Sequence, residues 1–252
     1  MAVTADGKLA YVSDYLTRGN TGTVKLLKLD GLKKEAKVDL VEDPGPDTPS
    51  SGRGFPNQLS ALAISPGGES VWVGCLKSNT SQGLHRSGEP LEPTNRVRGM
   101  LAMIDHPTQR EDLRRRIDLN NADMASAIAF SPNGRFAYVT HQGAGALSAY
   151  DLASARLVEQ GDGAAVSFAS RIDVGLAPQG IALSSDGHTA YVANFMSRSV
   201  SVVDVSDPNR LAIIRSIRVT KEPLAPAVAR GKQLFYTSAA PRMSQDGYTA
   251  CA

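Results

Sequence analysis

The sequence predicts an all-β fold in which one four-stranded unit is repeated four times. The first observation is a phrase that aligns without gaps at four places: MAVTADGKLAYVS, LAISPGGESVWVG, IAFSPNGRFAYVT and IALSSDGHTAYVA. The second is the spacing of these copies, whose central glycines are 61, 66 and 53 residues apart: Gly7, Gly68, Gly134 and Gly187. The third is that further strand-like runs follow each copy. Repeats of this length with four short strands are typical of propeller blades.

Each copy is expected to form a β-hairpin. A short apolar run enters Asp-Gly, Gly-Gly or Asn-Gly, which are the pairs that best tolerate positive φ in tight turns. The returning run carries an aromatic residue and then a valine, and both residue types favour strands. The four aromatic residues are Tyr11, Trp72, Tyr138 and Tyr191.

Two more strands complete each unit. The third is expected to end in an aspartate every time, at Asp30, Asp105, Asp151 and Asp204. The fourth is recognised in EAKVDL, RRRIDL, ASRIDV and IRSIRV. The predicted architecture is a β-propeller over residues 1–222, with blades at about 1–58, 59–124, 125–177 and 178–222, then a short C-terminal helix and loop.

The alignment also predicts an open arc. Met1 aligns with Ile181, which lies inside the first strand of the fourth copy, so the chain is expected to begin in mid-strand. No sequence-distant strand is available to join the first blade to the last. We therefore expect four blades of a larger ring.

Composition narrows the class of partner. A formal net charge of +2 gives no reason to expect a nucleic-acid groove, and no apolar run reaches the ~20 residues that a membrane-spanning helix needs. The opening residues lack the pattern of a signal peptide. The one basic run, residues 114–116, is balanced by Glu111 and Asp112 and is interpreted as a solvated loop.

Two long irregular stretches stand out, at residues 41–57 and 78–99. Long loops of this kind are often functional or mobile. We interpret both as mobile loops on the rim of the propeller, with contact to a protein partner as the alternative.

One aligned position carries side chains of chemical interest. Two residues after the repeated valine stand Asp14, Cys75, His141 and Asn194. The first three are possible metal ligands, and a rim cluster of Asp14, Cys75 and His141 is one interpretation. The other is that each side chain holds its own turn between strands. Neither HQGAGA at residues 141–146 nor DLNNAD at 118–123 meets the requirements of a phosphate or calcium loop, and the sequence assigns no catalytic residue.

The repeated phrases AYVTHQGAGALSAYD and AYVANFMSRSVSVVD resemble bacterial β-propellers with Tyr-Val-Thr-Asn (YVTN) repeats. The resemblance covers about residues 1–220. It implies a ring of about seven blades.

Residues 223–252 resemble a different family, the opening of bacterial di-haem cytochrome c peroxidases. The helix-favouring run from Pro226 leads through a turn to a cysteine one residue before the end. The matching residues are Gly231, Lys232, Leu234, Phe235, Arg242, Met243, Ser244, Asp246, Gly247 and Cys251. The resemblance implies that Cys251 is the first thioether cysteine of a Cys-x-x-Cys-His haem motif, which is cut before it is complete. No haem is expected on these 252 residues alone.

The resemblances together imply a propeller that serves as scaffold or docking platform in a periplasmic or extracellular c-type cytochrome. Haem c and the electron-transfer or peroxidase-like chemistry would belong to the full-length protein, and a protein redox partner would bind through the rim loops. These residues themselves are not expected to be catalytic. The alternative is a non-enzymatic propeller that binds protein or glycan, and a lactonase-like hydrolase on the same fold is a third possibility.

Overall fold

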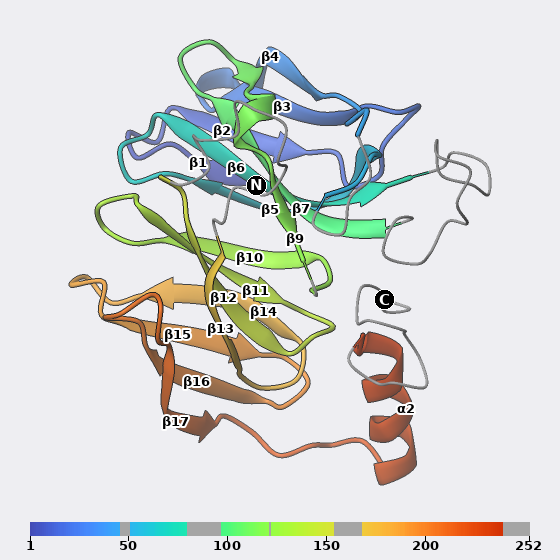
Figure 1. Cartoon of the computed structure of the whole chain (residues 1–252), viewed down its shortest axis with the longest axis vertical. Coiled ribbons are helices and arrows are strands. Elements are labelled where there is room, and N and C mark those ends of the chain that lie inside the picture. Colours follow the sequence, from blue (N-terminus) through green and yellow to red (C-terminus); the bar gives the residue numbers. More distant parts are fainter. Residues whose placement is uncertain (46–50, 80–96, 121, 154–167, 239–252) are drawn as a thin grey trace. The chain divides into compact units, whose positions relative to one another are not determined.

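A computed structural model describes residues 1–45, 51–79, 97–120, 122–153 and 168–238. The chain divides into two compact units. Unit 1 contains the described residues up to Asn120, and unit 2 contains those from Ala122 onward. The described residues form four antiparallel sheets, two in each unit, as expected for propeller blades (Figure 1).

Unit 1 holds blades 1 and 2. The strands of blade 1 are β1 (Ala2–Val3), β2 (Leu9–Ser13), β3 (Gly22–Lys28) and β4 (Lys33–Leu40). The strands of blade 2 are β5 (Phe55–Ile64), β6 (Ser70–Ser78), β7 (Val97–Asp105), β8 (Arg110–Glu111) and β9 (Ile117–Leu119). In both sheets the strands pair in the order of the sequence, and β8 and β9 share the outer place beside β7.

Unit 2 holds blades 3 and 4 and the helix α2 (Pro226–Tyr236). The strands of blade 3 are β10 (Ala125–Phe130), β11 (Phe136–His141), β12 (Ala146–Asp151) and β13 (Phe168–Asp173). The strands of blade 4 are β14 (Pro178–Leu183), β15 (Thr189–Asn194), β16 (Ser199–Asp204) and β17 (Ala212–Arg218). No helix within the described ranges is long and apolar enough to span a bilayer.

The repeated turns share one hydrogen-bond pattern. A Ser or Thr three residues before each glycine accepts the glycine N–H at its carbonyl and a second N–H at its hydroxyl, as Ser184 does from Gly187 and Thr189. In each Asp-Gly, Gly-Gly or Asn-Gly pair only the second residue has positive φ, between 68° and 74°. The first residue of the pair is conformationally ordinary, and in Asp186 its carboxylate instead accepts the hydroxyl of Ser184.

Sheet register corrects the expected end of the third strand in blade 1. Asp105, Asp151 and Asp204 pair with the first residue of the preceding strand, but in blade 1 this position is Lys28, opposite Leu9. Asp30 lies two residues beyond the strand, in a short 3-10 helix over Asp30–Leu32.

The fourth strand of blade 2 also differs from expectation, because the basic run interrupts it. A 3-10 helix over Leu113–Arg115 separates β8 from β9. Arg116 is not solvated: its side chain is 8% exposed, pairs with Glu111 at 2.7 Å and donates to the carbonyl of Val41. The guanidinium of Arg115 lies 5.5 Å from the centre of the Trp72 ring. The ion pair with Glu111 thus allows the side chain of Arg116 to be buried.

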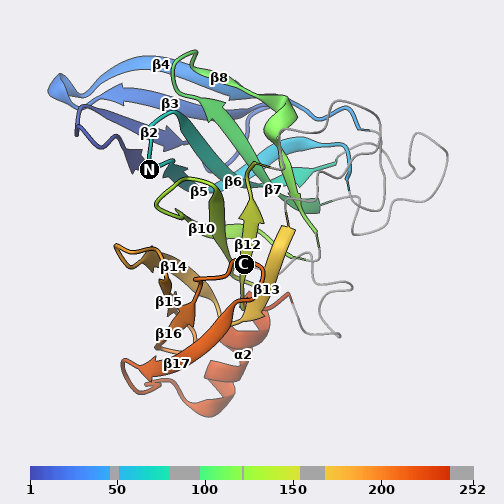
Figure 2. The same ribbon diagram turned by 60° about the vertical axis from the view of Figure 1, so that its left-hand side comes forward.

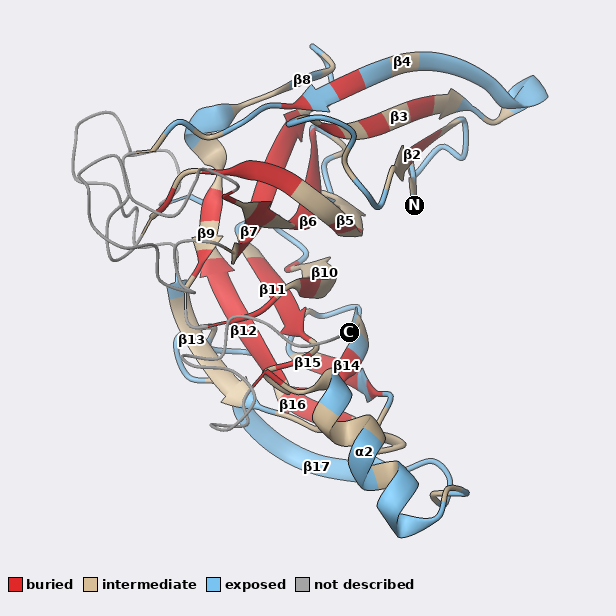
Figure 3. Cartoon of the chain, turned by 90° about the vertical axis from the view of Figure 1, so that its right-hand side faces the viewer, coloured by how far each residue is buried: buried red, intermediate tan, exposed pale blue. Residues whose placement is uncertain are grey.

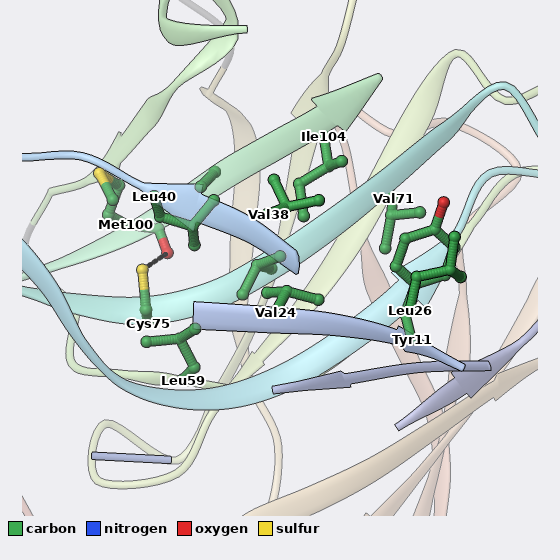
Figure 4. Packing of buried hydrophobic residues seen from close by; sticks show 12 residues of the cluster. Tyr11, Val24, Leu26, Val38, Leu40, Leu59, Val71, Cys75, Met100 and Ile104 are labelled. Carbon is green, nitrogen blue, oxygen red and sulfur yellow. Dashed lines mark hydrogen bonds between the residues drawn. The ribbon is translucent and has the colours of Figure 1, made fainter. Parts of the chain in front are cut away.

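Each unit is held together by one face of a blade packed on the opposite face of the next. We call the face that bears the repeated aromatic residue the aromatic face, and the one that bears the repeated valine the aliphatic face. In unit 1 the aromatic face of blade 1 joins the aliphatic face of blade 2 in one buried cluster (Figure 4). The blade 1 members include Tyr11, Val24, Leu26 and Val38, and the blade 2 members include Val71, Val73, Cys75 and Ile104.

Unit 2 repeats this arrangement. The aromatic face of blade 3, with Tyr138, Leu147 and Ala149, packs against Val192 and Val203 on the aliphatic face of blade 4. Figure 3 shows the buried colour along β11, β12 and β16, whereas β17 is exposed along its whole length. The burial follows from the alternation of the strands, since successive side chains point to opposite faces.

We predict that the turn glycines differ in how much they contribute to stability. Replacing Gly7 by Ala should cost about 1–2 kcal/mol, because an alanine has to adopt the left-handed backbone conformation of this turn. No steric cost is added, since nothing lies within 4 Å of the new methyl group. The Gly187→Ala methyl would lie 2.4 Å from Cδ of Pro132, which adds about 1–3 kcal/mol of steric strain. Urea unfolding of both variants measures the difference, and equal losses would contradict the packing at Gly187.

Candidate functional site

The aligned position after the repeated valine links strands in both blades of unit 2. His141 is fully buried, and its ring nitrogens lie 3.3 Å from the carbonyl of Asp123 and 3.0 Å from the hydroxyl of Ser148. Burial lowers the pKa of His141 to about 3, and the positive charge of Arg171 acts in the same direction. His141 is therefore a neutral residue at physiological pH.

Asn194 plays the same part in blade 4. Its side-chain oxygen accepts the N–H of Gly175 at 3.1 Å, and its amide donates to Ser199 and to Ser201 at 3.2 and 2.9 Å. Ser201 is the counterpart of Ser148, since each pairs with the repeated valine. These contacts hold the turn before the blade to the middle of its own sheet.

The equivalent residues of unit 1 have different partners. Asp14 is half-exposed and forms an ion pair with Lys25 at 2.6 Å. Cys75 is buried in the core, where its thiol lies 3.8 Å from the carbonyl of Met100 and burial raises its pKa to about 12. Among the described residues, no group of three or more His, Cys, Asp or Glu side chains could hold a metal ion. Their contacts are those of residues that tie down turns and strands.

A buried aspartate that the sequence did not single out fixes the β11–β12 turn. Asp123 is 5% exposed, and its carboxylate accepts the N–H of Gly143 and, at 3.1 Å, that of Ala144. Burial raises the pKa of Asp123 to about 6, against the opposing effect of these two hydrogen bonds. The run DLNNAD thus ends in a turn-holding residue.

The end of α2 is attached to the same turn. The N–H of Ser238 donates to the carbonyl of Gly143 at 2.9 Å, and the hydroxyl of Thr237 lies 3.3 Å from the same oxygen. A side chain at position 143 would meet Asp123 on one side and Ser238 on the other, at 2.5 and 2.8 Å. Position 143 is therefore restricted to glycine.

Aromatic and charged contacts attach the rest of α2 to blade 4. Tyr236 makes an edge contact with Phe195 at 6.2 Å between ring centres, and the Lys232 ammonium lies 4.3 Å from the centre of the Phe195 ring. Just before the helix, Glu222 forms a two-point ion pair with Arg198 at 3.1 and 3.2 Å. Figures 1 and 2 show α2 beside the ends of the unit 2 strands.

A small cavity lies between α2 and the blade ends. Its volume is about 60 Å³, and it is lined by the 142–145 turn, the residues before β14 and the inner side of the helix. Gln142, Met196, Gln233 and Tyr236 are its larger side chains. No carboxylate, histidine or cysteine is among its lining residues. The cavity is thus bounded by the helix on one side and by the turns of the blade ends on the other.

Unit 1 carries a second buried polar cluster, at Lys77. Its side chain is 1% exposed, and its ammonium lies 2.9 Å from Asp43 and 2.7 Å from Asp118. Asp118 also accepts the N–H of Gly52 at 3.3 Å, so the cluster attaches the link between the blades to the sheet of blade 2. Period-2 alternation could have indicated it, because Lys77 continues the inward row of Val73 and Cys75.

The two long stretches that were interpreted as rim loops are structured at their described ends. Phe55–Asn57 belong to β5, and residues 78 and 97–99 belong to β6 and β7. Residues 46–50 and 80–96, and Cys251 with the run from Arg242, lie outside the described residues. The haem assignment of Cys251 therefore stays a prediction.

Comparisons with known proteins support the fold. A family model described as a seven-bladed β-propeller lactonase matches residues 105–212, less than half of the chain. No curated protein matches the sequence. The haem-binding domain and the YVTN assignment are not reproduced by these comparisons.

Solved structures with the same fold include hydrazine synthase of Kuenenia stuttgartiensis, with 16% identity over 81% of this chain and 58% of that one, and a TM-score of 0.65. The periplasmic gluconolactonase PpgL of Pseudomonas aeruginosa has 14% identity over 89% of this chain and 58% of that one, and a TM-score of 0.58. A protein of unknown function from Desulfotomaculum acetoxidans has 16% identity over 87% and 56%, with a TM-score of 0.54. The chain spans less than two thirds of the length of each.

We predict that Lys77→Met lowers the free energy of unfolding by about 3–5 kcal/mol, because the largely buried carboxylate of Asp118 and the partly buried one of Asp43 lose the buried ammonium that pairs with them. The matched control is Lys28→Met, which removes an exposed pair with Glu35 and should cost less than about 1 kcal/mol. Chemical denaturation at neutral pH compares the two. A similar small loss in both would mean that the Lys77 cluster is hydrated.

We also predict that His141 makes the protein less stable in mild acid. Its folded pKa is about 3 and its unfolded pKa about 6.5, so stability present above pH 6.5 is lost as the pH falls toward 3. Between pH 7 and pH 5 this loss is about 2 kcal/mol.

The test compares the wild type with His141→Asn, which copies the residue at the equivalent position of blade 4. Asp123 works in the opposite direction, since its raised pKa favours the folded state as the pH falls, but it is present in both proteins and cancels. The variant should gain about 2 kcal/mol relative to the wild type between pH 7 and pH 5. A constant difference would mean that His141 titrates normally in the folded state.

Proposed function

We propose that these residues are the propeller scaffold of an extracytoplasmic c-type cytochrome, and that unit 2 holds the beginning of its haem-binding segment. The full-length protein would carry out electron transfer or a peroxidase-like reaction, and a protein redox partner would dock on it. The propeller fold is established, and the cytochrome assignment rests on the C-terminal residues.

The observation that carries the proposal is the attachment of α2. Gly231, Lys232, Leu234 and Phe235, which resemble the opening of di-haem peroxidases, lie on this helix. Lys232 contacts Phe195, and the residues after the helix bind the Gly143 carbonyl. A linker of this length would not need several directed contacts if it only connected independent domains. The contacts are those of a segment that orients the next part of the chain.

The residues present fit a c-type haem only in part. Cys251 supplies one thioether position, and among the described residues the other cysteine, Cys75, is buried in the core of unit 1. His141 and its neighbours are occupied by structural hydrogen bonds. When bound, haem would supply a redox-active iron. The second cysteine and the histidine of the motif are not among these 252 residues.

The location agrees with one of the comparisons, since the gluconolactonase of similar fold is itself periplasmic. The match to a lactonase model supports the propeller and leaves the activity open, because unrelated functions share this fold. A propeller that binds protein or glycan without haem remains the competing function. The two functions can be distinguished by one observation, which is whether haem is covalently attached to the full-length protein.

The test is covalent haem attachment to the natural gene product. The source gene is read beyond Ala252 and expressed with c-type maturation in the periplasm, and the denatured protein is examined for a haem absorbance band. Wild type should retain haem, and Cys251→Ser should lose at least about half of it, because one of two thioether bonds is absent. The matched control is Cys75→Ser, which should retain haem fully.

A stop codon directly after Ala252, or a matured protein without covalent haem, would overturn the proposal. Equal haem in wild type and Cys251→Ser would show that the attachment lies elsewhere and would overturn the role of Cys251. With a stop codon there, or without covalent haem, the protein would be a propeller-type binding module.

A further inference from the structure

A buried lysine in unit 1 faces two carboxylates that are distant in the sequence. The side chain of Lys77 on β6 is 1% exposed, and its ammonium lies 2.9 Å from Asp43 and 2.7 Å from Asp118. Lysine is rarely buried to this degree in folded proteins. By contrast, the lysine side chains of four other ion pairs are 41–80% exposed: Lys8, Lys25, Lys28 and Lys37.

The contact between Lys77 and Asp118 involves both oxygens of the carboxylate. The lysine nitrogen lies 2.7 Å from Oδ1 and 2.9 Å from Oδ2, so it faces the carbon atom between them. Because both oxygens are bonded to Cγ, these two distances place the nitrogen no farther from Cγ than the roughly 3–3.5 Å that separates reacting atoms positioned for bond formation. The amine and the carboxyl carbon are therefore in position to react.

The backbone around the cluster holds the three side chains in contact. Gly54 packs on the stem of Lys77, since a Cβ at position 54 would lie 3.0 Å from Cγ of the lysine. Asp43 and Gly54 exchange two backbone hydrogen bonds, at 2.8 and 3.0 Å. The N–H of Gly52 donates to the carboxylate of Asp118 at 3.3 Å. The segment that links the blades thus covers the lysine and positions both carboxylates.

The cluster contains one carboxylate more than its ammonium can balance. The neighbouring arginine does not supply the missing charge, because Arg116 is already paired with Glu111 at 2.7 Å. Buried charges are costly when they are not fully compensated. Joining Lys77 to Asp118 would remove two of the three charges. The remaining charge would stay on Asp43, which at 23% is the more exposed of the two carboxylates, against 9% for Asp118.

We propose that Lys77 and Asp118 condense to form an isopeptide bond, with Asp43 as the group that carries the proton. Asp43 takes one proton from the ammonium, and the neutral amine attacks Cγ of Asp118, so that an Nζ–Cγ bond forms. One C–O bond of Asp118 then breaks. Its oxygen leaves as water with two protons, one returned by Asp43 and one from the nitrogen, and the third proton stays on the amide. No oxidant or further reactant is needed.

The bond would fasten together strands that do not pair with each other. Lys77 lies on β6 and Asp118 on β9, and both strands pair with β7. The cross-link would therefore hold the sheet of blade 2 closed even when its hydrogen bonds open. This modification is independent of haem attachment, so its test and that of the cytochrome assignment have separate outcomes.

The test is the intact mass of the denatured 252-residue protein. The wild type should be lighter than its sequence by about 18 Da, the mass of one water. Peptide mapping should then find the peptide that contains Lys77 joined to the one that contains Asp118. Because the map is made on the wild type, it does not depend on whether any variant folds.

Substitutions at the two linked residues separate this bond from other losses of water. Closure of an Asp-Gly pair to a succinimide removes the same mass, but such a loss would persist in Lys77→Arg, whereas the isopeptide cannot form there. Asp118→Asn should still condense and release ammonia, so its deficit should be about 17 Da. The matched control is Lys28→Arg, which alters an exposed ion pair and should keep the full deficit.

Asp43→Asn tests the proton carrier. Loss of a positioned acid–base group should slow condensation by about a hundredfold or more, so freshly purified variant should have the mass of its own sequence. Far-ultraviolet circular dichroism checks that the variants are folded. A wild-type mass equal to that of the sequence, or a deficit unchanged in Lys77→Arg, would overturn the proposal. A cross-link from Lys77 to Asp43 would overturn the assignment of Asp118.

Discussion

The packing of one aromatic face on the next aliphatic face is the interaction on which each unit depends. A single antiparallel sheet of four short strands buries too little apolar surface to be stable alone, and the second face supplies the rest. The same two sets of positions make this interface in both units, around Tyr11 and around Tyr138. The turns, the buried polar residues and the attachment of α2 all lie at the ends of sheets that this packing has already fixed.

One aligned position of the repeat holds a different side chain in each blade, and each side chain has different partners. At the position after the repeated valine, His141 and Asn194 both link their own turn to a serine of the third strand. Cys75 fills the equivalent place with a thiol in an apolar core, and Asp14 pairs with a lysine at an exposed one. The side chain thus follows the polarity of the surroundings. Each of the four residues thus makes structural contacts of its own, to a turn, a strand or a neighbouring side chain.

The sequence predicted the strands and hairpins well, because the glycine turns and the period-2 alternation are local signals. The register of β3 was not predictable in the same way, since Asp30 looks like its counterparts until pairing with Leu9 is known. Lys77 and Asp123 were not recognised as buried, because their partners Asp43 and Gly143 become neighbours only in the folded sheets. Glu111 was recognised as a balancing charge for the basic run, but the burial of Arg116 also involves the carbonyl of Val41, which is distant in the sequence. The candidate site at α2 depends on such contacts, and the sequence supplied only the helix.

Gly143 links the buried aspartate of blade 3 to the residues that follow α2. Its carbonyl accepts the residues that follow α2, its N–H donates to the buried carboxylate of Asp123, and no side chain fits between Asp123 and Ser238. The hydroxyl of Ser238 is fully buried at this place without a hydrogen-bond partner among the described residues. The 142–145 turn thus fixes both the buried carboxylate of Asp123 and the residues that follow α2.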